Sequence, residues 1–303
     1  MSCGVRHFLD ITALDPVELQ AVLDLSEDPS PPKVLEGQGV ALLFEKPSNR
    51  TRHATEMAVV QLGGHPVYTR GEELGLDVRE TVEDVTRTLC GYHGVIAARV
   101  FEHSKLERMA AVSSAPVVNL LSDHSHPMQA LADALTLRQL LGPLAGRCIA
   151  YCGDYNNVAR SLGEVAALLG MHVRFGCPAG YDATPAELDR LRALGAASVA
   201  QAARPAEAVE GADAVYTDVW TSMGQEAEAA QRRMAFEGFT IDEAVMQRAR
   251  PGAVFLHCLP AHRNEEVAAE VIDGPRSHVF QQGHNRMHAA RGLLAFLLTH
   301  QAS

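Results

Sequence analysis

Two kinds of hydrophobic pattern alternate along the chain. Short apolar runs rich in Val, Ile and Leu are separated by longer segments in which apolar residues recur every three or four positions. This alternation predicts strand–helix–strand units, which build a parallel sheet with helices on its faces. We expect strands at Gly39–Glu45, Val95–Val100, Val117–Leu120, Cys148–Gly153, His172–Cys177, Ala214–Thr217 and Val254–Cys258.

Several helix ends carry signals of their own. Asp15-Pro16-Val17-Glu18 and Thr184-Pro185-Ala186-Glu187 each place a capping residue before a proline at the first helical position and a Glu at the third. Gly63-Gly64 and Gly170 are expected to end helices that would otherwise continue. Residues 225–238 are polar and helix-prone, and we interpret them as an insertion next to a functional site.

The length of 303 residues suggests two domains of about 150 residues each. We expect an α/β fold of two doubly wound parallel-sheet lobes, with domains at residues 1–140 and 141–303. An interdomain cleft is expected at the carboxyl ends of the strands. A final amphipathic helix, about residues 287–300, is long enough to pack back on either lobe.

Composition and charge narrow the function classes. Hydrophobic residues make up 47% of the chain, which is typical of a packed globular protein and excludes disorder. Lys and Arg total 26 against 37 Asp and Glu, a net charge of −11, so we expect neither nucleic acid nor an anionic membrane as a partner. The longest apolar runs are far shorter than the ~18 residues of a spanning helix, and the first fifteen residues lack an apolar signal core. The six cysteines include no CxxC pair, so we expect a reduced, cytoplasmic protein.

The strongest chemical signal is Ser48-Asn49-Arg50-Thr51-Arg52, directly after the first expected strand. The following residues have helical spacing, so the pentad lies in a turn at a helix N-terminus. Free backbone N–H groups, the positive end of the helix dipole, two hydroxyls and two guanidinium groups together favour an anion. A phosphate would also offset the repulsion between the arginines and the dipole.

A second candidate cluster is His126-Pro127-Met128-Gln129, between an expected strand and a helix. His126 offers a hydrogen bond to a carbonyl oxygen, and Gln129 can both donate to and accept from an amide. Arg99 ends another strand and is expected in the same crevice. Each residue alone is compatible with a structural role, but three at strand carboxyl ends favour a site.

The second half offers three further segments after expected strands. Gly153-Asp154-Tyr155-Asn156-Asn157 superficially suggests a dinucleotide loop, but GxGxxG is absent, which disfavours a nicotinamide cofactor. Asp218 and Ser222, in the segment that runs to Gly224, are suited to holding a cation. Cys258, in His257-Cys258-Leu259-Pro260, is either a partly exposed thiol or a small core residue.

Taken in order, these motifs resemble the ornithine carbamoyltransferase family. The resemblance runs from about Phe8 to Leu298 and includes Ser48–Arg52, His126–Gln129, Asp218 with Ser222-Met223-Gly224, His257–Pro260 and Asn285-Arg286. The first two motifs mark the aspartate/ornithine carbamoyltransferase superfamily, and the Ser-Met-Gly and His-Cys-Leu-Pro motifs point to ornithine as the acceptor.

The resemblance implies roles for individual residues, a homotrimer, and no metal or organic cofactor. We expect a role in arginine biosynthesis, with arginine breakdown as the alternative that the sequence leaves open. The resemblance implies catalytic roles for Arg99, His126, Asp218 and Cys258. It implies that carbamoyl phosphate is bound by Ser48, Asn49, Arg50, Thr51, Arg99, His126, Gln129, Cys258, Leu259 and Arg286, and L-ornithine by Asn157, Asp218, Ser222 and Met223. The chain departs from the family at Asn49, where Thr is usual, and at Gln282-Gly283-His284, just before Arg286.

The implied reaction moves the carbamoyl group of carbamoyl phosphate to the δ-amine of L-ornithine, giving L-citrulline and phosphate. Attack by the amine builds negative charge on the carbonyl oxygen, which Arg99, His126 and Thr51 are placed to stabilise. An alkyl ammonium has a pKa of ~10.4, so we expect activity to rise with pH through the neutral range. The alternatives are another acceptor (putrescine, acetylornithine or aspartate), a non-catalytic binding relative, and a nucleotide-dependent dehydrogenase.

Overall fold

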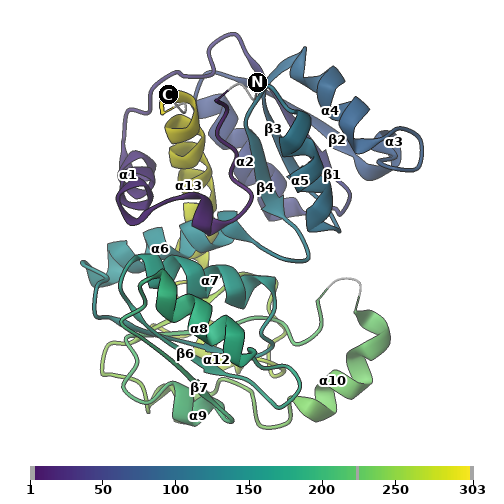
Figure 1. The fold of residues 1–303 in the computed structure, drawn as a ribbon. Coiled ribbons are helices and arrows are strands. Elements are labelled where there is room, and N and C mark those ends of the chain that lie inside the picture. Colours follow the sequence, from purple (N-terminus) through teal and green to yellow (C-terminus); the bar gives the residue numbers. More distant parts are fainter. Residues whose placement is uncertain (1–3, 223–224, 301–303) are drawn as a thin grey trace. The chain divides into compact units, whose positions relative to one another are not determined.

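The computed structural model describes residues 4–222 and 225–300, in which strands and helices alternate along the chain (Figure 1). The chain forms two compact units. Unit 1 comprises Met1–Leu135 and His284–Ser303, and unit 2 comprises Thr136–Gly283. The expected domain bounds, 1–140 and 141–303, differ from this division at both ends of unit 2.

Unit 1 contains a four-stranded parallel sheet with the strand order β2-β1-β3-β4. Its strands are β1 (Gly39–Phe44), β2 (His65–Arg70), β3 (His93–Arg99) and β4 (Val117–Leu121). Side chains of α4 (Val82–Cys90) and α5 (His103–Val112) pack with alternate residues of β1 and β3 in one core cluster. The helical elements that lie wholly in this unit are η1 (Ile11–Ala13), α1 (Pro16–Glu27), α2 (Asn49–Gln61), α3 (Gly71–Leu74), α4 (Val82–Cys90) and α5 (His103–Val112).

Unit 2 contains a five-stranded parallel sheet with the order β7-β6-β5-β8-β9. Its strands are β5 (Cys148–Cys152), β6 (His172–Gly176), β7 (Ser198–Ala202), β8 (Ala214–Thr217) and β9 (Val254–His257). Its helical elements are α7 (Asn157–Leu168), α8 (Pro185–Leu194), α9 (Pro205–Ala208), η2 (Glu226–Glu228), α10 (Ala229–Ala235), α11 (Glu243–Met246) and α12 (Ala269–Ile272). The α/β class and the parallel sheets agree with the sequence-based expectation.

Two helices have residues in both units. The boundary after Leu135 falls within α6 (Pro127–Leu141), and the boundary after Gly283 falls within α13 (Val279–Thr299). The expected final helix is therefore confirmed, although it begins eight residues earlier than the sequence pattern indicated. Across the residues that the structure describes, no helix is long and apolar enough to cross a membrane.

The sequence pattern missed two strands, β2 and β7, and both lie at an open edge of a sheet. Exposed residues alternate with buried or partly buried ones along much of β2 and β7, whereas inner strands such as β1 and β5 are almost wholly buried. An edge strand of this kind lacks the continuous apolar run that marks a buried parallel strand, and Pro66 is tolerated there because one side of β2 pairs with no strand.

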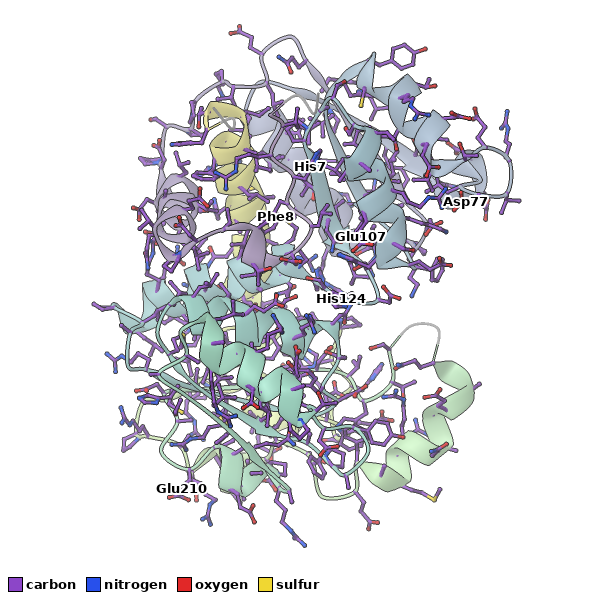
Figure 2. All side chains as sticks on the ribbon, in the orientation of Figure 1. His7, Phe8, Asp77, Glu107, His124 and Glu210 are labelled. Carbon is purple, nitrogen blue, oxygen red and sulfur yellow. The ribbon has the colours of Figure 1, made fainter. Side chains whose placement is uncertain are left out.

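The opposite edge of each sheet is covered by a short extended segment, so β4 and β9 are buried and were predicted correctly. Phe8, labelled in Figure 2, bridges Val118, with hydrogen bonds from Phe8 N to Val117 O and from Asn119 N to Phe8 O, both 2.8 Å. In unit 2, Ser277 bridges Phe255 of β9 in the same way. Covering an edge satisfies the backbone groups that would otherwise face solvent.

The predicted helix ends are present. Asp15 accepts from the backbone of Val17 and Glu18, and the Glu18 side chain accepts from Asp15 N, which completes a capping box. Thr184 caps α8. Gly63 and Gly170 follow α2 and α7 with φ of 86° and 67°, a conformation that favours glycine. The polar segment 225–238 forms η2 and α10, as its helical propensity indicated.

In unit 1, α13 packs against the end of α1 with almost no space between the two backbones. A Cβ placed on Gly292 would lie 2.6 Å from Ser26 N and 2.6 Å from Val22 O. The buried Arg291 side chain donates to the carbonyl oxygens of Ser26 and Asp28, both at 2.8 Å. These bonds satisfy carbonyl groups that the end of α1 leaves without helical partners.

We therefore expect Gly292→Ala to lower the free energy of unfolding by about 1–3 kcal/mol, because α13 must move away from α1. Gly283, on the same helix, is the matched control, since a Cβ there meets nothing within 4 Å. Gly283→Ala is expected to stabilise the protein by up to about 1 kcal/mol. Denaturant titrations of both variants measure the difference, and equal effects would contradict the close approach of α13 to α1.

Candidate active site

The N-terminus of α2 is built as the sequence indicated. Ser48 is the N-cap, and its hydroxyl accepts from Thr51 N at 3.4 Å and donates to Thr51 Oγ1 at 3.0 Å. Thr51 is buried, and its hydroxyl also accepts a hydrogen bond from Arg286 of α13. A residue near the end of the chain is thereby fixed beside the first turn of α2, in the same unit.

The other members of the pentad differ in where they point. Asn49 is exposed at the first position of α2, and Arg50 is partly buried, with no hydrogen-bond partner for its Nε among the described residues. Arg52 pairs with Glu56 at 2.8 Å, and its guanidinium lies 3.7 Å from the centre of the Tyr68 ring. Arg52 therefore braces α2 against β2, and Arg50 is left as the pentad's arginine suited to a ligand.

His126, Arg99 and Arg286 form a buried, positively charged cluster. Arg99 is the last residue of β3, His126 directly precedes α6, and all three side chains are no more than 6% exposed. Burial, together with the charges of Arg286 and Arg99, holds the pKa of His126 well below its usual value. The imidazole is therefore neutral at pH 7 and can donate one N–H to a ligand.

Gln129 completes this region one turn into α6. Its backbone N–H donates to His126 O at 3.1 Å, and its side-chain Nε2 donates to Asp133 Oδ1 at 2.8 Å. Its Oε1 is buried and has no hydrogen-bond partner within the part of the chain that the structure describes. We call the following six residues the unit 1 group: Ser48, Thr51, Arg99, His126, Gln129 and Arg286.

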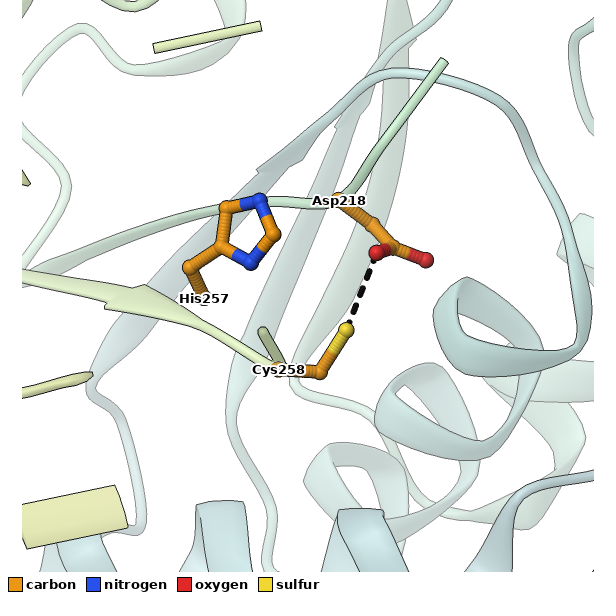
Figure 3. A group of neighbouring side chains, drawn as sticks. All are labelled: Asp218, His257 and Cys258. Atoms are coloured by element: carbon orange, nitrogen blue, oxygen red, sulfur yellow. Dashed lines mark hydrogen bonds between the residues drawn. The ribbon is translucent and has the colours of Figure 1, made fainter. Parts of the chain in front are cut away.

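In unit 2, Asp218 and Cys258 meet at the carboxyl ends of the neighbouring strands β8 and β9. Figure 3 shows the Cys258 thiol pointing at the Asp218 carboxylate, and Sγ donates to Oδ1 at 2.9 Å. Asp218 also accepts from Val219 N at 2.8 Å and from Asn156 Nδ2 at 3.1 Å. The carboxylate is buried and held by these three donors. Cys258 is partly exposed, so it is not simply a small core residue.

His257 lies beside this pair (Figure 3), and it positions the backbone around Cys258. Its Nδ1 accepts from Leu259 N at 2.9 Å, so its Nε2 carries the proton and faces Glu266 Oε1 at 3.2 Å. Leu259 has φ of 58°, a strained conformation for a branched residue that the bond to His257 helps to hold. Asp218, His257 and Cys258 have ligand-type atoms within 4.8 Å of one another, but both His257 nitrogens are engaged in these hydrogen bonds.

Asn156 is a site residue that the sequence analysis did not select. Its side-chain oxygen caps α7 by accepting from Val158 N and Ala159 N, while its amide nitrogen donates to Asp218. An Asn directly before a helix is a recognisable capping signal, but its contact with Asp218, 62 residues away, has no local signature. Asn157, which was selected, is the first residue of α7 and is partly buried.

Ser222 belongs to the loop that follows β8 and Asp218. Ser222 is partly buried, and its backbone N–H donates to Gln225 Oε1 at 3.0 Å. Met223 lies outside the described residues. The loop before it is anchored by Arg232 of α10, which donates to Asp154 at 2.7 Å and to Trp220 O at 2.9 Å.

The unusual residues before Arg286 do not prevent it from reaching Thr51. Gln282 is fully buried in unit 2, where its Oε1 accepts from His257 N at 2.9 Å. One turn further along α13, Arg286 donates to Thr51 in unit 1. The departures at Gln282-Gly283-His284 therefore leave the arginine within the unit 1 group.

The chain belongs to the aspartate/ornithine carbamoyltransferase family. Residues 6–139 match the family's carbamoyl-P binding domain, and residues 145–297 match its Asp/Orn binding domain. Together the two matches cover nearly the whole chain.

Individual relatives in this family are ornithine carbamoyltransferases. The chain is 48% identical over 297 residues to the enzyme of Thermus thermophilus, with 97% of each chain covered. The solved structure of ornithine carbamoyltransferase from Pyrococcus furiosus is 39% identical, with a TM-score of 0.92 and 97% of each chain covered. The solved structure from Thermus thermophilus has a TM-score of 0.89 at 45% identity, covering 97% of this chain and 99% of that one.

The neutral state of His126 predicts a loss of stability in acid. The unfolded chain binds a proton at this residue below pH ~6.5, whereas the folded chain binds it only at lower pH. The free energy of unfolding therefore decreases as the pH is lowered through that window. His126 is expected to account for up to about 1.4 kcal/mol of the loss between pH 7.5 and 5.5, the limit for a folded state that takes up no proton in this range. Denaturant titrations of the parent and His126→Gln measure it, and parallel pH profiles would contradict a neutral, buried His126.

Proposed function

We propose that this protein transfers the carbamoyl group of carbamoyl phosphate to the δ-amine of L-ornithine, giving L-citrulline and phosphate. The observation that carries the proposal is the buried unit 1 group, which combines a helix N-terminus with Arg99 and Arg286 around a neutral His126. Positively charged groups buried together in this way favour the binding of an anion. The names of the relatives support carbamoyl phosphate as that anion and ornithine as the acceptor.

In this proposal, carbamoyl phosphate binds in unit 1. The phosphate takes the N-terminus of α2, including Asn49 N–H and the side chains of Ser48, Arg50 and Thr51, where unsatisfied N–H groups and the dipole favour it. Arg286 is held at the same place by its bond to Thr51. Gln129 has a free side-chain oxygen for the carbamoyl NH₂.

Arg99 and His126 supply the main stabilisation of the transition state. When the amine attacks the carbonyl carbon, negative charge develops on the carbonyl oxygen, and fixed donors lower the barrier without rearranging. A neutral imidazole donates one hydrogen bond without drawing the phosphate away from the arginines. The bond from carbon to the phosphate oxygen then breaks, phosphate leaves with the bonding electrons, and it takes up the proton that the amine nitrogen loses.

Unit 2 supplies the groups that bind ornithine, the acceptor substrate. Asp218 is a buried carboxylate whose present donors include a thiol, a weak donor that an ammonium or amine N–H of ornithine can replace. Cys258 and Leu259 then lie next to the reacting carbon. Asn157, Ser222 and Met223 serve the α-amino-acid end of ornithine.

We further propose that the enzyme is a homotrimer, as the family resemblance implies, and that it serves arginine biosynthesis in the cytoplasm. Exposed apolar side chains on α2 and on the open edge strand β2 support self-association: Met57, Val60 and Val67 are each 39–48% exposed. Sedimentation measures the assembly state of the purified chain.

The deciding experiment is an acceptor panel. We expect ureido product from carbamoyl phosphate with L-ornithine, and at least about 100-fold lower kcat/KM with putrescine, acetylornithine or aspartate. Putrescine lacks the α-carboxylate, so the groups that recognise it would be left unpaired in a desolvated pocket. If kcat/KM is higher with any of these acceptors than with ornithine, that compound is the substrate and the proposal is wrong.

Asp218→Asn keeps the size of the side chain and removes its charge. We expect kcat/KM for ornithine to fall at least about 100-fold, equivalent to ~2.7 kcal/mol, since the amide cannot stabilise an ammonium group. Steady-state kinetics measure the loss. Carbamoyl phosphate binding, followed by calorimetry, is expected to change little, because Asp218 belongs to unit 2.

Arg50→Ala is the counterpart in unit 1. We expect it to weaken carbamoyl phosphate binding at least tenfold, through loss of a charge-assisted contact worth about 1.5–3 kcal/mol. If Arg50→Ala binds carbamoyl phosphate normally, or if Asp218→Asn weakens that binding equally, the assignment of one substrate to each unit is wrong.

A further inference from the structure

A second set of metal-ligand side chains lies outside the groups assigned to the transfer reaction. His262, Glu265 and Glu266 bring one imidazole nitrogen and two carboxylate oxygens within 4.8 Å of one another. His262 Nδ1 lies 3.9 Å from Glu265 Oε2 and 3.8 Å from Glu266 Oε2. One imidazole with two carboxylates is a donor set that Zn²⁺ accepts in proteins.

Glu266 distinguishes this set from an ordinary surface cluster. Its side chain is 0% exposed, and Oε1 accepts from His257 Nε2 and from the backbone N–H of His262. Oε2 is buried and has no hydrogen-bond partner among the described residues. A buried carboxylate oxygen without a donor is costly, and a cation at this point would remove the cost.

The backbone that carries these residues is fixed on both sides. Glu266 O accepts from Ile241 N at 2.9 Å, and Glu265 O accepts from Thr240 Oγ1 at 2.6 Å. Asn264, with φ of 68°, closes the turn by donating to Val267 O at 2.7 Å. The ligand atoms are therefore positioned by the fold before an ion arrives, which favours binding.

The distances between the ligand atoms fit a divalent ion, and two of the three side chains are carboxylates, which attract a cation. Two ligands at about 2.1 Å from a tetrahedral ion are about 3.4 Å apart, so the observed 3.8 and 3.9 Å require only a small movement. Arg233 pairs with the other oxygen of Glu265, at 2.7 Å, and leaves Oε2 for the ion. His262 and Glu265 are partly exposed, which provides access from solvent.

We propose that His262, Glu265 and Glu266 bind a divalent transition-metal ion, Zn²⁺ in the first place, with water completing the coordination. The inference goes beyond the proposed function and does not depend on it. Its site is joined to the reaction machinery through Glu266 Oε1, which bonds His257, the residue before Cys258. A bound ion would fix Glu266 and, through His257, the backbone of the Cys258 loop.

The test is calorimetric titration of the metal-stripped full chain with Zn²⁺, in a Cys258→Ser background that removes the competing thiol beside Asp218. We expect one ion per chain, with His262→Ala and Glu265→Gln each weakening binding at least tenfold. His65→Ala is the matched control, because His65 is an exposed histidine on β2, far along the chain from the site. It is expected to bind Zn²⁺ like the parent.

Thermal unfolding provides a second readout that is independent of activity. Since an ion that binds only the folded state stabilises it, added Zn²⁺ should raise the Tm of His65→Ala but not that of His262→Ala. Similar Tm values without metal establish that both variants are folded. The proposal is overturned if no binding occurs up to about 1 mM Zn²⁺, or if His262→Ala binds Zn²⁺ as tightly as the control.

Discussion

The burial of several positively charged groups at one place is the constraint on which the chemistry of unit 1 depends. Arg99 and Arg286 are almost wholly buried, and the N-terminus of α2 adds the positive end of its dipole. Burial, together with the charges of Arg286 and Arg99, lowers the pKa of His126 and keeps it neutral. The chain as a whole has a net charge of −11, so this positive charge is confined to one place. A dianion that binds there is stabilised by it.

Unit 2 has the opposite character at the corresponding edge of its sheet. A single carboxylate, Asp218, is surrounded by an amide, a backbone N–H and a thiol, all neutral donors. Neutral donors hold a carboxylate in place without cancelling its charge, so it remains attractive to an ammonium group. The two units thus offer complementary chemistry, one for an anion and one for a cationic acceptor, from the same arrangement of parallel strands.

Local signals explain which features were predictable from the sequence. Buried strands such as β1 and β5 have continuous apolar runs, and Ser48 is a capping residue at the start of α2. The pattern of residues was therefore enough to locate these strands and this helix. The open edge strands β2 and β7 could not, because exposed residues, three of six in β2 and two of five in β7, interrupt their apolar runs. Asn156 and Glu266 were missed for another reason. Asn156 contacts Asp218, just after β8, and Glu266 contacts His257 at the end of β9, and these contacts exist only after folding.

Helix α13 contributes Gln282 to unit 2 and Arg286 to unit 1, so the linear order of the chain and its division into units do not coincide. A cut near residue 140 would separate the first sheet from the helix that packs on α1 and from one of its buried arginines. Chimeras that exchange acceptor specificity between relatives therefore need two crossover points, one in α6 and one in α13, with the C-terminal segment kept from the parent that supplies the first sheet.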